Sequence, residues 1–256
     1  MARMGGRRHL KTLVAPKFWP VRGKVGVFTV KPSPGPHPIH RCIPLLIIVR
    51  DVLGYAKTGR EARKLIAEGH FKVDGRVRRN YKYPVGFMDV LEVVDTGEKY
   101  RILPYPVRFF ILHPISDEEA EFKLGRVEDK STVKGGHIQL HLHDGRNVLI
   151  RVADPTNPVE AKLYKTLGTV KISIPEQKLI DYAPLEIGSP VIVFGGRNIG
   201  RVGRVVSIHR GMRRYRSIVT IEDVRGEKFQ TSLDYVFVIG PPGGEPWISL
   251  PEGAWK

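Results

Sequence analysis

Two groups of cationic side chains in the first third of the chain have the spacing of a phosphate-binding face. One group lies on a predicted helix and the other on the predicted hairpin after it: Arg60, Arg63 and Lys64, then Lys72, Arg76 and Arg78. The hairpin cations alternate with apolar residues, so we expect them to share its outer face. A basic face attracts nucleic-acid phosphates, since each contact releases counterions. A single basic helix is most often an ordinary solvated surface. Here both the helix and the hairpin carry cations that could form one face, which favours RNA contact.

A glycine-rich segment, residues 191–205, is the second candidate for phosphate binding. It lacks the Lys-Ser/Thr of a P-loop and the spacing of a dinucleotide-binding turn. It predicts instead two strands joined by a turn, in which Gly196, Gly200 and Gly203 permit tight bends and close backbone approach. A purely structural glycine turn is the alternative. The basic run that follows, residues 210–216, is typical of a loop that pairs with phosphates or stacks on a base.

Metal-ion and catalytic chemistry are not favoured. His141 and His143 would share one strand face, but structural zinc sites usually need four Cys or His ligands, and no cysteine lies nearby. The single cysteine, Cys42, permits neither an internal disulfide nor a Cys-x-x-Cys site. The acidic residues of 117–121 fit the first turn of a helix. Without a nucleophile motif, we expect no catalytic residue, no metal, no cofactor and no small-molecule substrate.

Two helices and a hairpin are predicted to carry the first basic groups. An apolar stripe over residues 45–53 predicts the first helix, with Pro44 at its first position. Thr58 and Glu61 have the spacing of a capping box at the start of the second helix. The Asp-Gly pair at 74–75 is a strong signal for a hairpin turn.

The rest of the chain is predicted to be mostly β. Ser116 and Glu119 predict one short helix. Alternating patterns and turn signals predict strands at 88–94, 107–112, 138–143, 147–152, 168–174, 178–182, 190–194, 203–209, 217–222, 228–232 and 235–239. The close spacing of the last five strands indicates a small barrel.

The overall charge identifies the class of partner. The 256 residues carry a formal net charge of +16, with 42 Lys and Arg against 26 acids, which favours a polyanionic partner. Residues 1–60 hold 12 of these cations and one acid, so most of the excess lies near the N-terminus. No run approaches the roughly 18 apolar residues of a membrane span, and no apolar signal core follows the basic N-terminus. We therefore expect a cytoplasmic protein with RNA or DNA as its partner and no membrane.

Residues 1–41 are predicted to form a basic, extended arm. Four prolines within 32–38 exclude a helix or a central strand there. Phe18, Trp19 and Phe28 are costly in a solvated tail, so the arm is expected to lie on the protein's own surface or on a partner. We expect it to be sensitive to proteases when the protein is free and protected when bound.

Two segments resemble known RNA-binding modules. Residues 58–77 resemble the α-L motif of several ribosomal proteins and RNA-modifying enzymes, and residues 191–205 resemble a KOW motif. The whole chain resembles the S4e family of small-subunit ribosomal proteins, archaeal type. That resemblance rests also on residues 9–19, 35–37, 83–90, 237–240 and 246–251, in a fixed order along the chain.

The resemblance implies an α+β, mostly β fold in five parts. These are a basic arm (1–41), a helix-helix-hairpin α-L domain (42–105), a central family-specific β domain (106–185), a C-terminal KOW, SH3-like barrel (186–240) and a C-terminal arm (241–256). It implies a structural, ribosome-bound protein that binds small-subunit rRNA and other small-subunit ribosomal proteins in translation. The alternative is an RNA-modifying enzyme of pseudouridine synthase type that uses the α-L domain to capture its substrate.

The expected RNA-binding residues combine the arm, the α-L segment and the barrel. They are Arg7, Arg8, His9, Lys11, Lys17, Trp19, Lys57, Thr58, Arg60, Arg63, Lys64, Lys72, Arg76, Arg78, Arg79, Arg197, Asn198, Arg201, Arg204, Arg210, Arg213, Arg214 and Arg216. The basic run 210–216 exceeds what the resemblance leads us to expect after a KOW turn.

Overall fold

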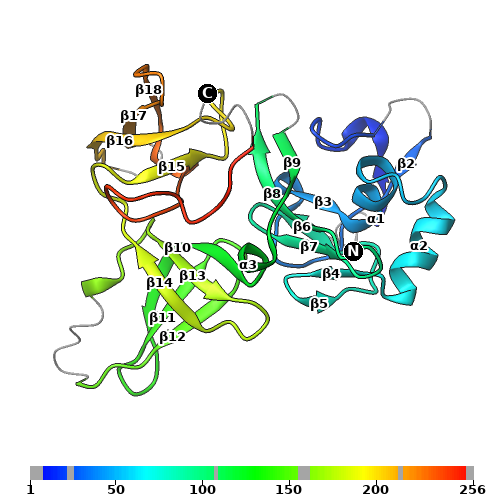
Figure 1. Cartoon of the computed structure of the whole chain (residues 1–256), viewed down its shortest axis with the longest axis horizontal. Coiled ribbons are helices and arrows are strands. Elements are labelled where there is room, and N and C mark those ends of the chain that lie inside the picture. Colours follow the sequence, from blue (N-terminus) through cyan, green and yellow to red (C-terminus); the bar gives the residue numbers. More distant parts are fainter. Residues whose placement is uncertain (1–7, 22–25, 107–108, 155–161, 213–215, 252–256) are drawn as a thin grey trace, which may run out of the picture. The chain divides into compact units, whose positions relative to one another are not determined.

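The computed structural model has mostly β structure with few, short helices (Figure 1), which confirms the predicted fold class. It describes residues 8–21, 26–106, 109–154, 162–212 and 216–251. The chain folds as two units, residues 1–98 and residues 99–256. The five-part division of the sequence stays a prediction.

The arm of the first unit is anchored to the unit's own core. Its strands β1 (Leu10–Lys11) and β2 (Phe28–Thr29) pair antiparallel. The Trp19 side chain is only 4% exposed, and its indole Nε1 donates to the Cys42 carbonyl at 2.8 Å. Farther along, His37 is buried with its Nε2 3.0 Å from an Asp89 carboxylate oxygen. The described part of the arm therefore lies on the protein's own surface, one of the two predicted settings.

The two predicted helices are present, and local signals explain their ends. Helix α1 (Leu45–Ile47) begins after Pro44 and continues as a π-helical turn (Ile48–Val52). Helix α2 (Gly59–Glu68) begins with both hydrogen bonds of the predicted capping box and ends at Gly69, which adopts a left-handed conformation. Figure 1 shows α1 and α2 side by side.

Replacing the capping residue should weaken α2 modestly. The Thr58 hydroxyl accepts a hydrogen bond from the Glu61 amide, a group that lacks a helical partner. Thr58→Ala should lower the free energy of unfolding by about 1 kcal/mol in urea titrations. Thr58→Ser keeps the hydroxyl and should stay close to wild type. Equal losses in both variants would mean that the cap is not the cause.

Short strands complete the first unit. Strand β3 (Cys42–Pro44) pairs with β6 (Pro84–Gly86). The predicted hairpin is formed by β4 (Phe71–Val73) and β5 (Arg76–Val77), and β4 also pairs with β7 (Val90–Val93). Gly86 packs against the His37 ring so closely that an added Cβ would lie 2.4 Å from it, which fixes the arm against this strand.

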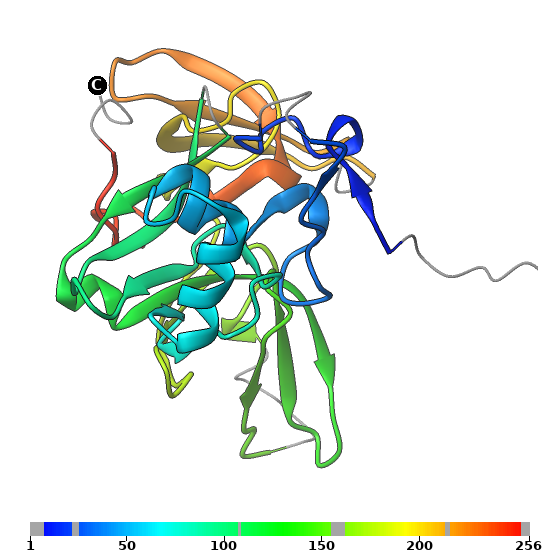
Figure 2. The ribbon, with the colours of Figure 1, turned by 90° about the vertical axis from the view of Figure 1, so that its right-hand side faces the viewer.

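The second unit begins with a hairpin and a central sheet. Strand β8 (Lys99–Tyr105) pairs with β9 (Phe109–Pro114), and α3 (Asp117–Ala120) follows, capped by Ser116 as predicted. The central sheet has the order β12-β11-β10-β13-β14. Figure 2 shows the long β10–β11 hairpin of this sheet in green. The strands of this sheet are β10 (Phe122–Thr132), β11 (Ile138–Leu142), β12 (Asn147–Ile150), β13 (Thr169–Ser173) and β14 (Leu179–Ala183).

Strands β8 and β10 were not predicted from the sequence. In β10 the reason is that charged residues occupy buried positions. Lys123 is fully buried, and its Nζ lies 2.9 Å from the Asp144 carboxylate. Arg126 is 2% exposed and donates to the carbonyls of Asp234 and Val236, both at 2.9 Å. Buried cations are rare unless they are paired, so such residues are normally read as surface positions.

The last sheet matches the strands predicted for a barrel. It is antiparallel, with the order β18-β17-β16-β15-β19. Its strands are β15 (Pro190–Val193), β16 (Val202–His209), β17 (Ile218–Glu222), β18 (Lys228–Ser232) and β19 (Val236–Val238). Gly196 and Gly200 have positive φ, and an added Cβ at Gly203 would lie 2.3 Å from the Glu222 carbonyl oxygen. The three glycines are therefore needed for turns and close approach, as predicted.

Among the described residues, no helix is long and apolar enough to cross a membrane.

Candidate nucleic-acid interface

Helix α2 presents three exposed cations on one side and buries the other. Arg60, Arg63 and Lys64 are spaced by three and four residues, which places them on one helix face. The opposite face buries Ala62 and Ile66 completely. Lys64 is loosely paired with Glu68 at 3.9 Å, with both side chains exposed. The arrangement is a rigid row of charge at the surface, as the sequence predicts.

The hairpin cations do not share one face, contrary to the sequence prediction. The register pairs Lys72 with Val77, and Val73 with Arg76. Paired residues of antiparallel strands point to the same side, so Lys72 and Arg76 point to opposite sides. The two-residue turn at 74–75 fixes this register and so determines which side of the hairpin each residue faces. Lys72 is also engaged, since its Nζ lies 2.9 Å from Glu92.

The remaining cations of this region extend the α2 face in different ways. Arg76 and Arg79 are exposed, as are Lys57 and Thr58 before the helix. The Arg78 guanidinium lies over the Tyr83 ring, 4.5 Å from its centroid. This contact holds Arg78 in place by a cation–π interaction.

The arm supplies exposed cations, but its tryptophan is not among the exposed groups. Arg8, His9, Lys11 and Lys17 are exposed, whereas Arg7 lies outside the described residues. Trp19 is buried and donates its indole hydrogen to the backbone. Its ring has no open face for a base, so we leave Trp19 out of the interface; its role is to anchor the arm.

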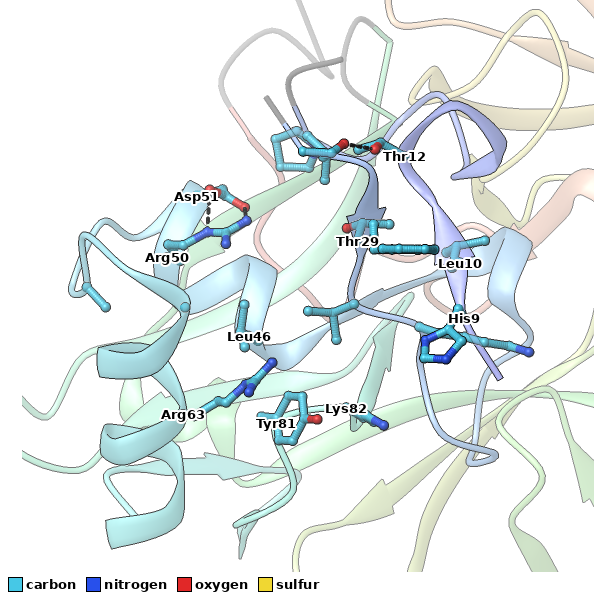
Figure 3. Close-up of a pocket in the computed structure, with 18 of the residues that line it drawn as sticks. His9, Leu10, Thr12, Thr29, Leu46, Arg50, Asp51, Arg63, Tyr81 and Lys82 are labelled. Carbon is cyan, nitrogen blue, oxygen red and sulfur yellow. Dashed lines mark hydrogen bonds and ion pairs between the residues drawn. The ribbon is translucent and has the colours of Figure 1, made fainter. Parts of the chain in front are cut away.

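A groove of about 1130 Å³ lies between the arm and the helices of the first unit (Figure 3). In Figure 3, His9 projects from the arm strand, and Arg63, Tyr81 and Lys82 lie along the facing edge. Arg50 also lines the groove, paired in two hydrogen bonds of 2.9 and 2.8 Å with the carboxylate of its neighbour.

The groove is strongly basic. Of the described residues that line it, six are Lys or Arg and one is acidic: Arg8, Lys31, Arg50, Lys57, Arg63, Lys82 and, as the acid, Asp51. The Arg63 guanidinium lies over the Tyr81 ring at 4.6 Å, and the Lys82 ammonium lies 5.5 Å from the same ring centroid. The ring therefore holds two cations at the edge of the groove.

Several groove residues were not predicted from the sequence. Phe28, Lys31, Tyr81 and Lys82 were not among the expected binding residues, yet all four line the groove. A signal for two of them was present, because Lys82 lies between Tyr81 and Tyr83, just after three arginines at 76, 78 and 79. That interleaving is typical of RNA-binding surfaces.

In the second unit, the glycine-rich turn presents one fully available arginine and one that is neutralised. Arg197 is exposed at the turn, and Asn198 donates to the Gln230 carbonyl at 3.1 Å. Arg201 is ion-paired with Asp223 at 3.1 Å and with Glu227 at 3.0 Å. These two carboxylates neutralise the positive charge of Arg201, which was predicted to contact phosphate.

Other predicted barrel residues remain at the surface. Arg204, Arg210 and Arg216 are exposed, while Arg213 and Arg214 lie outside the described residues. Arg204 stands on β16 opposite Glu222 and Pro190, so it is held by the sheet rather than by a loop.

The histidines of the central sheet have structural partners. His141 lies 2.8 Å from the Ser131 hydroxyl and 2.7 Å from the Asn147 side-chain oxygen. His143 accepts a hydrogen bond from the Arg126 amide at 3.2 Å. In the described part of the chain, no three His, Cys, Asp or Glu side chains come together in a way that could hold a metal ion.

Family models match four consecutive parts of the chain. An RS4NT (NUC023) domain matches residues 4–40 and an S4 domain matches residues 44–91. The ribosomal family S4e matches residues 96–179, and the 40S ribosomal protein S4 C-terminus matches residues 223–254.

Similar proteins cover the whole chain. The small ribosomal subunit protein eS4 of Hyperthermus butylicus is 85% identical over 256 residues, covering 100% of both chains. That of Methanocaldococcus jannaschii is 47% identical and covers 98% of this chain and 100% of the relative. The crystal structure of the 30S ribosomal protein S4e from Thermoplasma acidophilum has a TM-score of 0.65 at 30% identity, covering 78% of this chain and 96% of that one. The chain therefore belongs to the S4e (eS4) family of small ribosomal subunit proteins.

Proposed function

We propose that this chain is a structural, non-catalytic component of the small ribosomal subunit that binds and stabilises small-subunit rRNA. The observation that carries this proposal is the row of Arg60, Arg63 and Lys64 on α2, exposed on a helix whose other side is buried. The helix fixes the backbone positions of these cations, so only their side chains have to be ordered when they bind phosphates. The arm, the groove and Arg197 extend the proposed interface.

The finer parts of the proposal follow from family membership. We propose that the chain works in the cytoplasm, bound to the ribosome, beside other small-subunit ribosomal proteins. The five predicted parts of the sequence are retained as proposed domains. Arg7, Arg213 and Arg214 are retained as proposed contacts on sequence grounds alone.

The RNA-modifying enzyme has no support from the family matches or from the site. Two aspartates stand in turn contexts, Asp144 before Gly145 and Asp154 before Pro155, which is not the active-site strand that such an enzyme would need. Asp144 is also 2% exposed and ion-paired with Lys123 and Arg146. A nucleoside analysis of rRNA incubated with the purified protein should therefore find no new modification. Formation of pseudouridine would reverse this ranking.

The salt dependence of rRNA binding tests the main proposal. Affinity of the full chain for small-subunit rRNA should fall steeply with salt, since several phosphate contacts release counterions together. Arg60→Ala should weaken binding and reduce the slope of log K against log salt by about 1, the value for one phosphate contact.

A matched cation in the second unit provides the control. Lys178 is exposed and ion-paired with Glu176, so Lys178→Ala removes the same charge from outside the proposed interface. It should change neither affinity nor slope. Equal effects of Arg60→Ala and Lys178→Ala would contradict the assigned interface, and salt-independent binding by the wild type would contradict the proposed function.

A further inference from the structure

We propose that the groove between the arm and the helices of the first unit binds an unpaired stretch of RNA, with its bases stacked on Phe28 and His9. The inference rests on the proposed function and deepens it, because it assigns one class of RNA structure to one place on the protein. Of the α2 cations, Arg63 lines the groove and Arg60 and Lys64 do not, and the groove also has aromatic side chains at its wall.

The aromatic side chains are the first argument. Phe28 is 59% exposed, although burying an aromatic ring would be strongly favourable. Its ring and that of His9 are neighbours, with centroids 5.5 Å apart and planes tilted by 49°. Proteins that bind single-stranded nucleic acid combine a basic groove with exposed aromatic rings on which bases stack. An apolar ring left at the wall of a basic groove fits that combination.

The distribution of charge is the second argument. Arg8 and Lys31 come from the arm, and Arg63 and Lys82 come from the opposite wall, so cations stand on both sides of the groove. The carboxylate of Asp51, which is the one acidic group among the described lining residues, is already paired with Arg50. A phosphate backbone running along the groove would meet cations on either side, while its bases could turn toward the rings of the arm.

Size and stiffness are the third argument. The volume of about 1130 Å³ slightly exceeds that of typical small-molecule sites, roughly 300–1,000 Å³, and suits more than one nucleotide. The walls are preformed, since Leu46 is buried in the helix and Trp19 and His37 fix the arm to the core. A duplex would bury its bases and leave the rings without a partner.

Removing the Phe28 ring tests the assignment. The probe is a fluorescein-labelled nine-nucleotide oligouridylate, with a nine-base-pair RNA duplex as its comparison, measured by anisotropy on the full chain. Phe28→Ala should weaken oligouridylate binding roughly 5- to 150-fold, the loss of one stacked base, and leave duplex binding unchanged. Leu13→Ala is the matched control, since Leu13 is an 86% exposed apolar residue of the same arm that does not line the groove.

A second measurement uses the wild-type chain. Oligouridylate containing 4-thiouridine should cross-link to residues 8–12, 28–31 or 81–82. The inference is wrong if Phe28→Ala and Leu13→Ala behave alike, if Phe28→Ala weakens the duplex equally, or if the cross-links fall elsewhere. Binding of small-subunit rRNA without binding of oligouridylate would overturn this inference alone. Failure of the wild type to bind rRNA would overturn the proposed function itself.

Discussion

Lys123→Ala should destabilise the second unit by about 3–5 kcal/mol at neutral pH, the usual cost of breaking a buried ion pair. Both side chains of the Lys123–Asp144 pair are fully buried, so the variant leaves a carboxylate inside the protein without its nearest counter-charge. Arg146 also contacts Asp144, at 3.1 Å, and compensates only in part. Urea unfolding of the full chain measures the loss.

The pH dependence of this loss separates charge from packing. Burial raises the pKa of the Asp144 carboxyl, but the charges of Lys123 and Arg146 and the hydrogen bond from Lys123 outweigh burial and hold that pKa well below its usual range. Because the pKa of Asp144 is lower in the folded than in the unfolded protein, its ionised form stabilises the fold above about pH 4. This stabilisation is lost as the pH falls toward the pKa of the folded state. In Lys123→Ala, fewer charges oppose the effect of burial on the Asp144 pKa, so this carboxyl is protonated at a higher pH.

The stability difference between wild type and Lys123→Ala should therefore shrink between pH 6 and pH 3. A difference that stays constant would assign the effect to the lost side-chain volume instead. Two controls accompany it. Lys178→Ala removes an exposed cation and should leave unfolding unchanged. The double variant Lys123→Met with Asp144→Leu replaces the pair by apolar groups and should recover part of the stability, because the Arg146 side chain and amide still lose Asp144 as their partner.

Trp19→Ala should release the arm, with cleavage by a protease within residues 8–21 or 26–31 at least roughly 100-fold faster than in the wild type. A buried Trp→Ala change costs about 3–5 kcal/mol, and here most of that cost falls on the local attachment of the arm. The hydrogen bond from the indole to the Cys42 carbonyl is lost as well. Limited proteolysis with mass spectrometry measures the rate.

Trp19→Phe keeps a ring in the same site without the indole donor. Its cleavage rate should lie between those of the wild type and Trp19→Ala. The sequence alone predicted an arm that is open to proteases in the free protein. The anchors at Trp19 and His37 instead predict slow cleavage of the described part of the wild-type arm. Equally fast cleavage of wild type and Trp19→Ala would show that these contacts do not hold the arm.

Local sequence signals determined the elements of this protein. Thr58 and Glu61 specify where α2 begins, and the Asp-Gly pair at 74–75 specifies the hairpin, because these signals act within a few residues of backbone. The spacing of strands after residue 190 likewise gave the elements of the last sheet. The row of cations on α2 follows from helical periodicity alone.

Which charged and aromatic groups are available to a ligand was decided only by the tertiary structure. Lys72 is matched by Glu92, twenty positions away, and Arg201 by Asp223 and Glu227. Trp19 was expected to bind RNA and Lys123 has the charge of a surface residue, but both are buried, whereas Phe28 is left exposed.

The groove itself brings the arm next to residues 81–82, which no local pattern encodes. The sequence by itself therefore determined that the protein is basic, mostly β and suited to RNA. The tertiary structure decided which of its cations and rings face a partner, because burial and charge neutralisation depend on residues that are distant in the chain.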